Sequence, residues 1–144
     1  MYEEWRVLHI DEDEEESRAF CDALEQNQFA GKCDTVRSIG EGKKWLEESL
    51  YMPRIHPRPD IVVLNWHVER DDEVLDFVRW LRAQPQFRET PLAVWVGAET
   101  PTSVRERVRT AGVTELINKP DTSEELVEQT EELLQRCTSH CVAR

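Results

Sequence analysis

The sequence has no long apolar run. No stretch of about 18 consecutive apolar residues, the length that spans a bilayer, occurs among its 144 residues. Met1 is followed by the polar residues Tyr2, Glu3 and Glu4, which is unlike a secretory signal peptide. We therefore expect a cytoplasmic protein without a membrane partner.

Positive charge is also scarce. Lys and Arg total 18 against 30 Asp and Glu, which gives a formal net charge of -12. Such a field repels phosphate backbones and anionic lipid surfaces, so nucleic acid is not expected as a direct partner. Six consecutive acids, Asp11 to Glu16, concentrate the charge near the N-terminus.

Cysteines are few and widely spaced. Cys21, Cys33, Cys137 and Cys141 do not resemble a disulfide framework, so we expect thiols, which say little about function. Cys137, His140 and Cys141 have a spacing that can place three ligands on one helical face. Because only three ligands are present and they lie close to the chain end, a structural role is favoured over a metal site. A zinc ion or a disulfide shared between two chains stays an open alternative.

Hydrophobic residues make up 39% of the chain, and five of its residues are Trp, which is enough for a folded core. The length is typical of one domain. We expect a single domain over residues 1–137 and a C-terminal tail over 138–144.

Short apolar runs alternate with amphipathic stretches along this domain. The runs predict strands at 6–10, 33–36, 61–64, 92–96 and 114–117. The stretches between and after them predict helices at 14–26, 42–49, around 74–81, at 101–110 and from 122 or 123 onward. Pro53 and Pro57 predict a loop at 51–58. Alternating strands and helices favour an α/β fold with a doubly wound, five-stranded parallel sheet.

In such a sheet the ligand site lies beyond the carboxyl ends of the strands. The residues expected at those ends are Asp11, Glu12, Asn65, Val96, Gly97 and Lys119.

Several motifs occur together in order. They are Val7 to Asp13, Pro59 to Asn65, Pro91, Ala111-Gly112 and Asn118-Lys119-Pro120. With them the sequence resembles the receiver domain of bacterial two-component response regulators, over residues 5 to about 135. The proline-rich loop before Pro59 resembles the single-domain receivers that serve phytochrome-type histidine kinases. The resemblance implies a flavodoxin-like fold with five helices and a role in phosphorelay signal transduction.

The chain departs from the receiver pattern at three positions. The family's third-strand Asp accepts a phosphoryl group with the help of Mg²⁺, but the matching residue is Asn65, whose amide cannot form an acyl phosphate. Val96 stands where the family has a Ser or Thr, and Leu116 stands at the position of the switch aromatic. We therefore expect a degenerate pseudo-receiver that is not phosphorylated in the ordinary way.

Asp11, Glu12 and Lys119 are the family's remaining site residues. Two carboxylates in place of three predict weak or absent Mg²⁺ binding and no other cofactor. Lys119, without a phosphoryl partner, is expected to pair with Asp11 or Glu12. Asp13 to Glu16 are expected to begin a helix and to face water.

The last two expected helices carry opposite charges. Arg105, Arg107 and Arg109 lie on one, and acids including Glu124 and Glu128 lie on the other. Such helices can meet across a two-fold axis, so a homodimer is one interpretation. Two solvated helix exteriors are the other.

These features predict a signalling adaptor that acts through contact with a protein, such as a histidine kinase or a downstream signalling protein, and that is not an enzyme. One alternative keeps phosphorylation but moves it to Asp60, Asp71 or Asp72. A second is a phosphatase using the Asp-x-Asp pattern of Asp11 and Asp13, although those enzymes use a longer chain.

Overall fold

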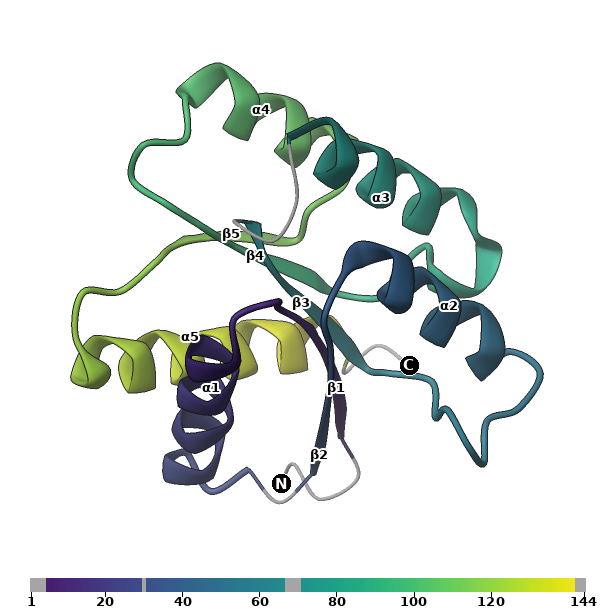
Figure 1. The fold of residues 1–144 in the computed structure, drawn as a ribbon, viewed down its shortest axis with the longest axis horizontal. Coiled ribbons are helices and arrows are strands. Elements are labelled where there is room, and N and C mark those ends of the chain that lie inside the picture. The colour runs from purple at the N-terminus through teal and green to yellow at the C-terminus, as the bar shows by residue number, and fades with distance from the viewer. Residues whose placement is uncertain (1–4, 30, 67–70, 142–144) are drawn as a thin grey trace.

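The computed structural model describes residues 5–29, 31–66 and 71–141. Its five strands are β1 (Arg6–Ile10), β2 (Lys32–Val36), β3 (Ile61–Asn65), β4 (Leu92–Val96) and β5 (Glu115–Asn118). They form one parallel sheet in the order β2-β1-β3-β4-β5. The helices are α1 (Glu14–Gln26), α2 (Ile39–Ser49), α3 (Asp71–Ala83), α4 (Thr102–Ala111) and α5 (Ser123–Cys141), with the short 3-10 helix η2 (Pro85–Phe87) after α3. The expected doubly wound, flavodoxin-like fold is confirmed (Figure 1).

Each face of the sheet has its own apolar core. Phe20 and Leu24 of α1 and Leu133 of α5 pack on one face. Leu46 of α2 and Val78 of α3 pack on the other, where α4 also lies. Every residue of β3 and β4 is buried, because helices cover these central strands on both faces (Figure 1).

Polar side chains cap the N-termini of α1 and α2. Asp13 accepts a hydrogen bond from the Glu16 amide at the start of α1, and Ser38 accepts one from the Glu41 amide at the start of α2. The Ser38 cap explains why α2 begins at Ile39, earlier than the apolar pattern predicts.

The remaining elements differ from the sequence prediction mainly at their ends. β5 covers Glu115–Asn118, one residue later than expected. Helix α5 continues through Cys141, beyond the expected boundary at residue 137, and Cys137 is buried. Residues 51–58 have no regular helix or strand, as their prolines predict. Among the described helices none is long and apolar enough to cross a bilayer.

Arg82, near the end of α3, joins the neighbouring connections. Its guanidinium donates to the carbonyls of Phe87 and Thr90 at 2.9 and 2.7 Å and to that of Gly112 at 2.9 Å. Gly112 ends α4 with a φ of 129°, and a Cβ there would lie 2.7 Å from Arg82 Cγ. One half-buried cation thus joins the approach to β4 and the α4–β5 turn.

Candidate functional site at the carboxyl edge of the sheet

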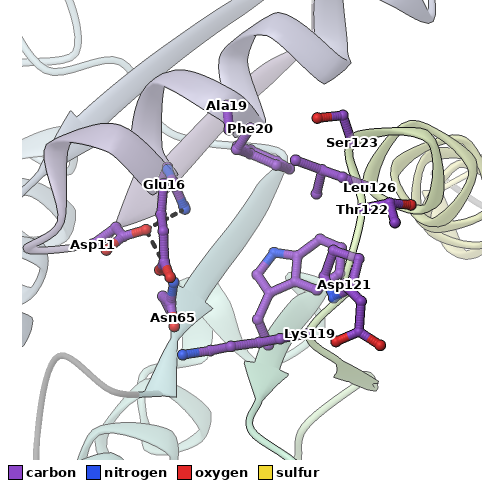
Figure 2. A pocket seen from close by; sticks show the side chains of 13 residues that line it. Asp11, Glu16, Ala19, Phe20, Asn65, Lys119, Asp121, Thr122, Ser123 and Leu126 are labelled. Atoms are coloured by element: carbon purple, nitrogen blue, oxygen red, sulfur yellow. Dashed lines mark hydrogen bonds and ion pairs between the residues drawn. The ribbon is translucent and has the colours of Figure 1, made fainter.

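The ends of β1 and β3 place an acid beside an amide. Ile10 pairs with Leu64, so Asp11 and Asn65 follow side by side. Asn65 Nδ2 donates to Asp11 Oδ2 at 3.1 Å and also to Glu16 Oε2 (Figure 2). The amide therefore bridges two carboxylates that would otherwise repel each other.

Asp11 is fully buried, and its hydrogen bonds come from more than one side. Its Oδ1 accepts from the Asp13 amide at 2.9 Å, while Oδ2 faces Asn65. A buried carboxylate is costly unless donors surround it. The turn that begins α1 and the Asn65 amide supply such donors.

Glu16 belongs to the site, whereas Glu12 is exposed and lies outside the cavity lining. Glu16 is exposed, as expected, but its carboxylate also accepts a hydrogen bond from Asn65 and lines the cavity. Asp13 caps α1, and Glu16, three residues later in its first turn, accepts from Asn65 through Oε2.

His9 lies beneath Asp11 on the same face of β1. It is 1% exposed, its Nε2 is 3.7 Å from Asp11 Oδ2, and its ring centroid is 4.6 Å from that of Phe20. Within the described part of the chain, His9 Nδ1 has no hydrogen-bond partner. Burial, with a smaller contribution from the charge of Arg37, lowers the pKa of His9 to about 3. The imidazole is therefore neutral at pH 7.

Lys119 reaches the same site from the end of β5. Its amide donates to the Val96 carbonyl at 2.9 Å, and its side chain extends toward Asn65 (Figure 2). The pairing of its ammonium with Asp11 or Glu12 stays a prediction.

These side chains line a cavity of about 270 Å³ between α1 and the β5–α5 loop. Its polar end contains Asp11, Glu16, Asn65 and Lys119, and apolar side chains such as Phe20, Trp95 and Leu126 line the rest. Of the residues expected at the site, the structure brings Asp11, Asn65 and Lys119 together. Sequence reasoning missed His9, because a polar residue inside an apolar strand reads as part of the core.

Val96 and Leu116 lie on the other side of the sheet. Val96 is fully buried in the core beneath α3 and α4, and Leu116 packs against the same core. Neither side chain has a hydroxyl or aromatic group to offer.

The donor set does not fit Mg²⁺. A magnesium ion needs oxygen ligands, and carboxylate charge is its main source of affinity. Here the Asn65 amide nitrogen, which carries hydrogens, lies between Asp11 and Glu16. Among the described residues no group of three or more His, Cys, Asp or Glu could hold a metal ion.

The surface charges expected at a dimer interface differ in their availability. Arg105 is half-buried and donates to the Gly97 carbonyl at 2.8 Å and to Asn118 Oδ1 at 2.7 Å. Arg107 and Arg109 are exposed on α4, as are Glu124 and Glu128 on α5. Of the expected Cys137, His140 and Cys141 cluster, Cys137 is buried, and the other two side chains lie outside the described residues.

No family model matches the sequence, and no curated protein matches it either. Solved structures do match. The phosphorylated cyanobacterial phytochrome response regulator RcpA superposes with a TM-score of 0.80 at 15% identity, covering 94% of this chain and 95% of that one. A response regulator in red light signalling of R. palustris gives 0.78 at 17% identity, covering 90% of each chain.

A chemotaxis response regulator, CheY4 of Vibrio cholerae, gives a TM-score of 0.69 at 20% identity, covering 93% of this chain and 98% of that one. Together with the strand order β2-β1-β3-β4-β5, these similarities show that the chain has the fold of response regulator receiver domains.

Proposed function

We propose that this protein is a signalling domain of the receiver type that acts through protein contact, without phosphorylation at the end of β3. The observation that carries the proposal is Asn65, which occupies the end of β3 and donates its amide hydrogens to Asp11 and Glu16. The receiver fold and its similarity to phytochrome response regulators support the signalling role.

The chemistry of the amide supports the absence of phosphorylation. Phosphoryl transfer to a side chain needs a nucleophilic atom and a cation that neutralises the transferred oxygens. Asn65 offers a neutral amide whose nitrogen lone pair is delocalised. The same amide holds the two nearest carboxylates, so the site is stabilised in one arrangement without metal or phosphate.

The path by which receivers pass a phosphorylation signal to their surface is also altered. Val96 and Leu116 are apolar and packed into the core under α3 and α4. A change at Asn65 would therefore meet no movable hydroxyl at position 96 and no aromatic side chain at position 116. We infer that a partner protein recognises a fixed surface.

The partner is proposed to be a histidine kinase or a downstream signalling protein. The net charge of -12 disfavours nucleic acid. A homodimer through α4 and α5 is part of this proposal, with Arg107 and Arg109 of one copy facing Glu124 and Glu128 of the other. Charge reversal at Arg107 and Arg109 should then lower the sedimentation coefficient to that of the monomer, and an unchanged coefficient would contradict the dimer.

Phospho-analogue binding tests the central claim. The wild type is incubated with Mg²⁺ and either acetyl phosphate or beryllofluoride, and then measured by intact mass and Trp fluorescence. We expect no adduct, and we expect Asn65→Asp to gain one under the same conditions. A stoichiometric adduct on the wild type would refute phosphorylation-independent action.

Peptide mapping of such an adduct would also test acceptors elsewhere. Asp60 Oδ2 accepts from the Arg6 amide at 2.9 Å, at the opposite end of the sheet from the cavity. Asp71 Oδ1 accepts from Trp66 Nε1 at 2.7 Å, and Asp72 is exposed at the start of α3. None of these three acids lines the cavity that contains Lys119. We therefore propose that none of them replaces the third-strand acceptor.

We further propose that the domain has no phosphatase activity. Asp13, the second acid of the Asp-x-Asp pattern, is engaged as the cap of α1. A generic phosphatase substrate with Mg²⁺ should give no turnover, and turnover that disappears in Asp11→Asn would overturn this assignment.

A further inference from the structure

Two thiols outside the cavity lie next to each other between α1 and the edge strand β2. Cys21 Sγ and Cys33 Sγ are 3.9 Å apart. One turn earlier on α1, Ser17 Oγ donates to Thr35 Oγ1 at 3.3 Å. Two side-chain pairs, Ser17 with Thr35 and Cys21 with Cys33, therefore join α1 to β2. Both thiols are partly exposed, whereas Cys137 is buried. The packing of a helix on a strand therefore positions this pair.

We propose that Cys21 and Cys33 form a redox-active dithiol, which a neutral hydroperoxide such as hydrogen peroxide oxidises to an intramolecular disulfide. Thiol pairs in reducing compartments that become oxidised are usually transient and redox-sensing. The proposal does not depend on the phosphorylation state of the domain, because neither cysteine lines the cavity.

The two thiols have different roles. A hydrogen bond from the Cys33 thiol lowers the pKa of Cys21 to about 7, and the Thr35 hydroxyl acts in the same direction. The bond to Cys21, together with burial, raises the pKa of Cys33. Because the thiolate is the attacking species, Cys21 reacts first and Cys33 resolves the product.

The reaction balances in two steps. The Cys21 thiolate attacks one peroxide oxygen, an S–O bond forms, the O–O bond breaks, and the departing hydroxide takes a proton to become water. Cys33 sulfur then attacks the Cys21 sulfenic acid, an S–S bond forms, the S–O bond breaks, and the departing hydroxide takes the Cys33 proton. Two thiols lose two electrons in total, and the peroxide becomes two waters.

Sulfenic acid formation also prepares the second step. The pKa of Cys33 is raised mainly because its proton is shared with the Cys21 thiolate. Once Cys21 is oxidised, that anion is gone, and the Cys33 proton is released more readily.

The surrounding charge selects the oxidant. Asp22, Glu25 and Asp34 all disfavour a thiolate at this pair through their negative charge. The same charges repel anionic oxidants such as glutathione disulfide, whereas a neutral peroxide approaches without this cost. A disulfide would fasten the middle of α1 to β2 directly beside Phe20, which lines the cavity.

The test uses the full, reduced chain treated with hydrogen peroxide at near-equimolar concentration. Remaining thiols are alkylated under denaturing conditions, and the monomer is analysed by intact mass and non-reducing peptide mapping. We expect two of the four cysteines to be protected, a peptide linking Cys21 to Cys33, and reversal by dithiothreitol. Four alkylated thiols, or a link through another cysteine, would refute the proposal.

Variants test the order of the steps. In Cys33→Ser we expect a Cys21 sulfenic acid that dimedone traps, whereas Cys21→Ser should form no link and Cys137→Ser should behave as wild type. In untreated wild type at pH 7, Cys21 should react with iodoacetamide about tenfold faster than Cys33. Equal rates, or faster oxidation by glutathione disulfide than by peroxide, would contradict the assigned roles.

Discussion

Replacing Asn65 with Asp puts a third carboxylate beside two others. The change removes the amide hydrogens that Asp11 and Glu16 accept, and places a negative charge within about 3.1 Å of Asp11 Oδ2. At an effective dielectric constant of about 20, such a pair repels by about 5 kcal/mol. The introduced carboxyl can instead take a proton, which at pH 7 costs about 4 kcal/mol from an ordinary Asp pKa. We therefore expect a destabilisation of about 2–4 kcal/mol.

The pH dependence of this loss has a definite sign. Repulsion raises the pKa of the introduced carboxyl in the folded state, so the folded protein holds a proton that the unfolded chain releases. The loss of stability is then absent below about pH 3.9 and grows as the pH rises toward neutrality. Urea denaturation at pH 5 and pH 7 measures it, and millimolar Mg²⁺ should restore much of the lost stability at pH 7.

Asn118→Asp is the matched control for this experiment. Asn118 Oδ1 already accepts from Arg105 at 2.7 Å at an exposed position, so a carboxylate there faces a cation. We expect a change within about 0.5 kcal/mol. An Asn65→Asp protein as stable as wild type at pH 7 without Mg²⁺ would refute the bridging role of the amide.

Three other predictions concern His9 beneath the site, Arg82 at the amino edge of the sheet and the affinity of the site for Mg²⁺. The lowered pKa of His9 means that the unfolded chain binds a proton near pH 6.5 that the folded protein excludes, so stability falls by about 1.4 kcal/mol per pH unit as the pH drops below that value. In urea denaturation, His9→Gln should reduce the fall between pH 6.5 and 5, and an undiminished fall would contradict this reasoning. Arg82→Lys loses the planar guanidinium fork and should lower the free energy of unfolding by about 2–3 kcal/mol. Arg79→Lys, at an exposed position on the same helix, should lower it by less than about 0.5 kcal/mol. Equal urea midpoints for the two variants would contradict this. Calorimetric titration of the wild type with Mg²⁺ should show no low-micromolar binding, and such binding would count against the amide-bridged arrangement.

The fold was predictable because its signals are local. The buried runs of β3 and β4 and the apolar spacing of α1 are set by neighbouring residues in the sequence, and both match the structure closely. The carboxyl-edge rule then located Asp11 and Asn65 correctly. The start of α2 was predicted three residues too late, because the Ser38 cap decides it and the apolar pattern does not.

Parts of the site were not predictable because they depend on side-chain direction. An acid in the first turn of a helix faces water unless the helix end points at another group, and only the fold shows that Glu16 meets Asn65. The proximity of Cys21 and Cys33 likewise depends on how α1 packs on β2. The alternation of side chains along β1 explains why His9 is buried on the same face as Asp11. That alternation does not predict that its Nε2 lies 3.7 Å from Asp11 Oδ2.

The bridging amide of Asn65 has a consequence for how such a domain could be controlled. Two N–H groups on one side chain occupy the place between the carboxylates, so the arrangement draws nothing from solution. Neither the concentration of free Mg²⁺ nor the supply of a phosphodonor would then change the state of the site. On the proposed function, the strength of the output would then follow the number of copies of the protein and the abundance of its partner, and any chemical control would act elsewhere in the domain, as at Cys21 and Cys33.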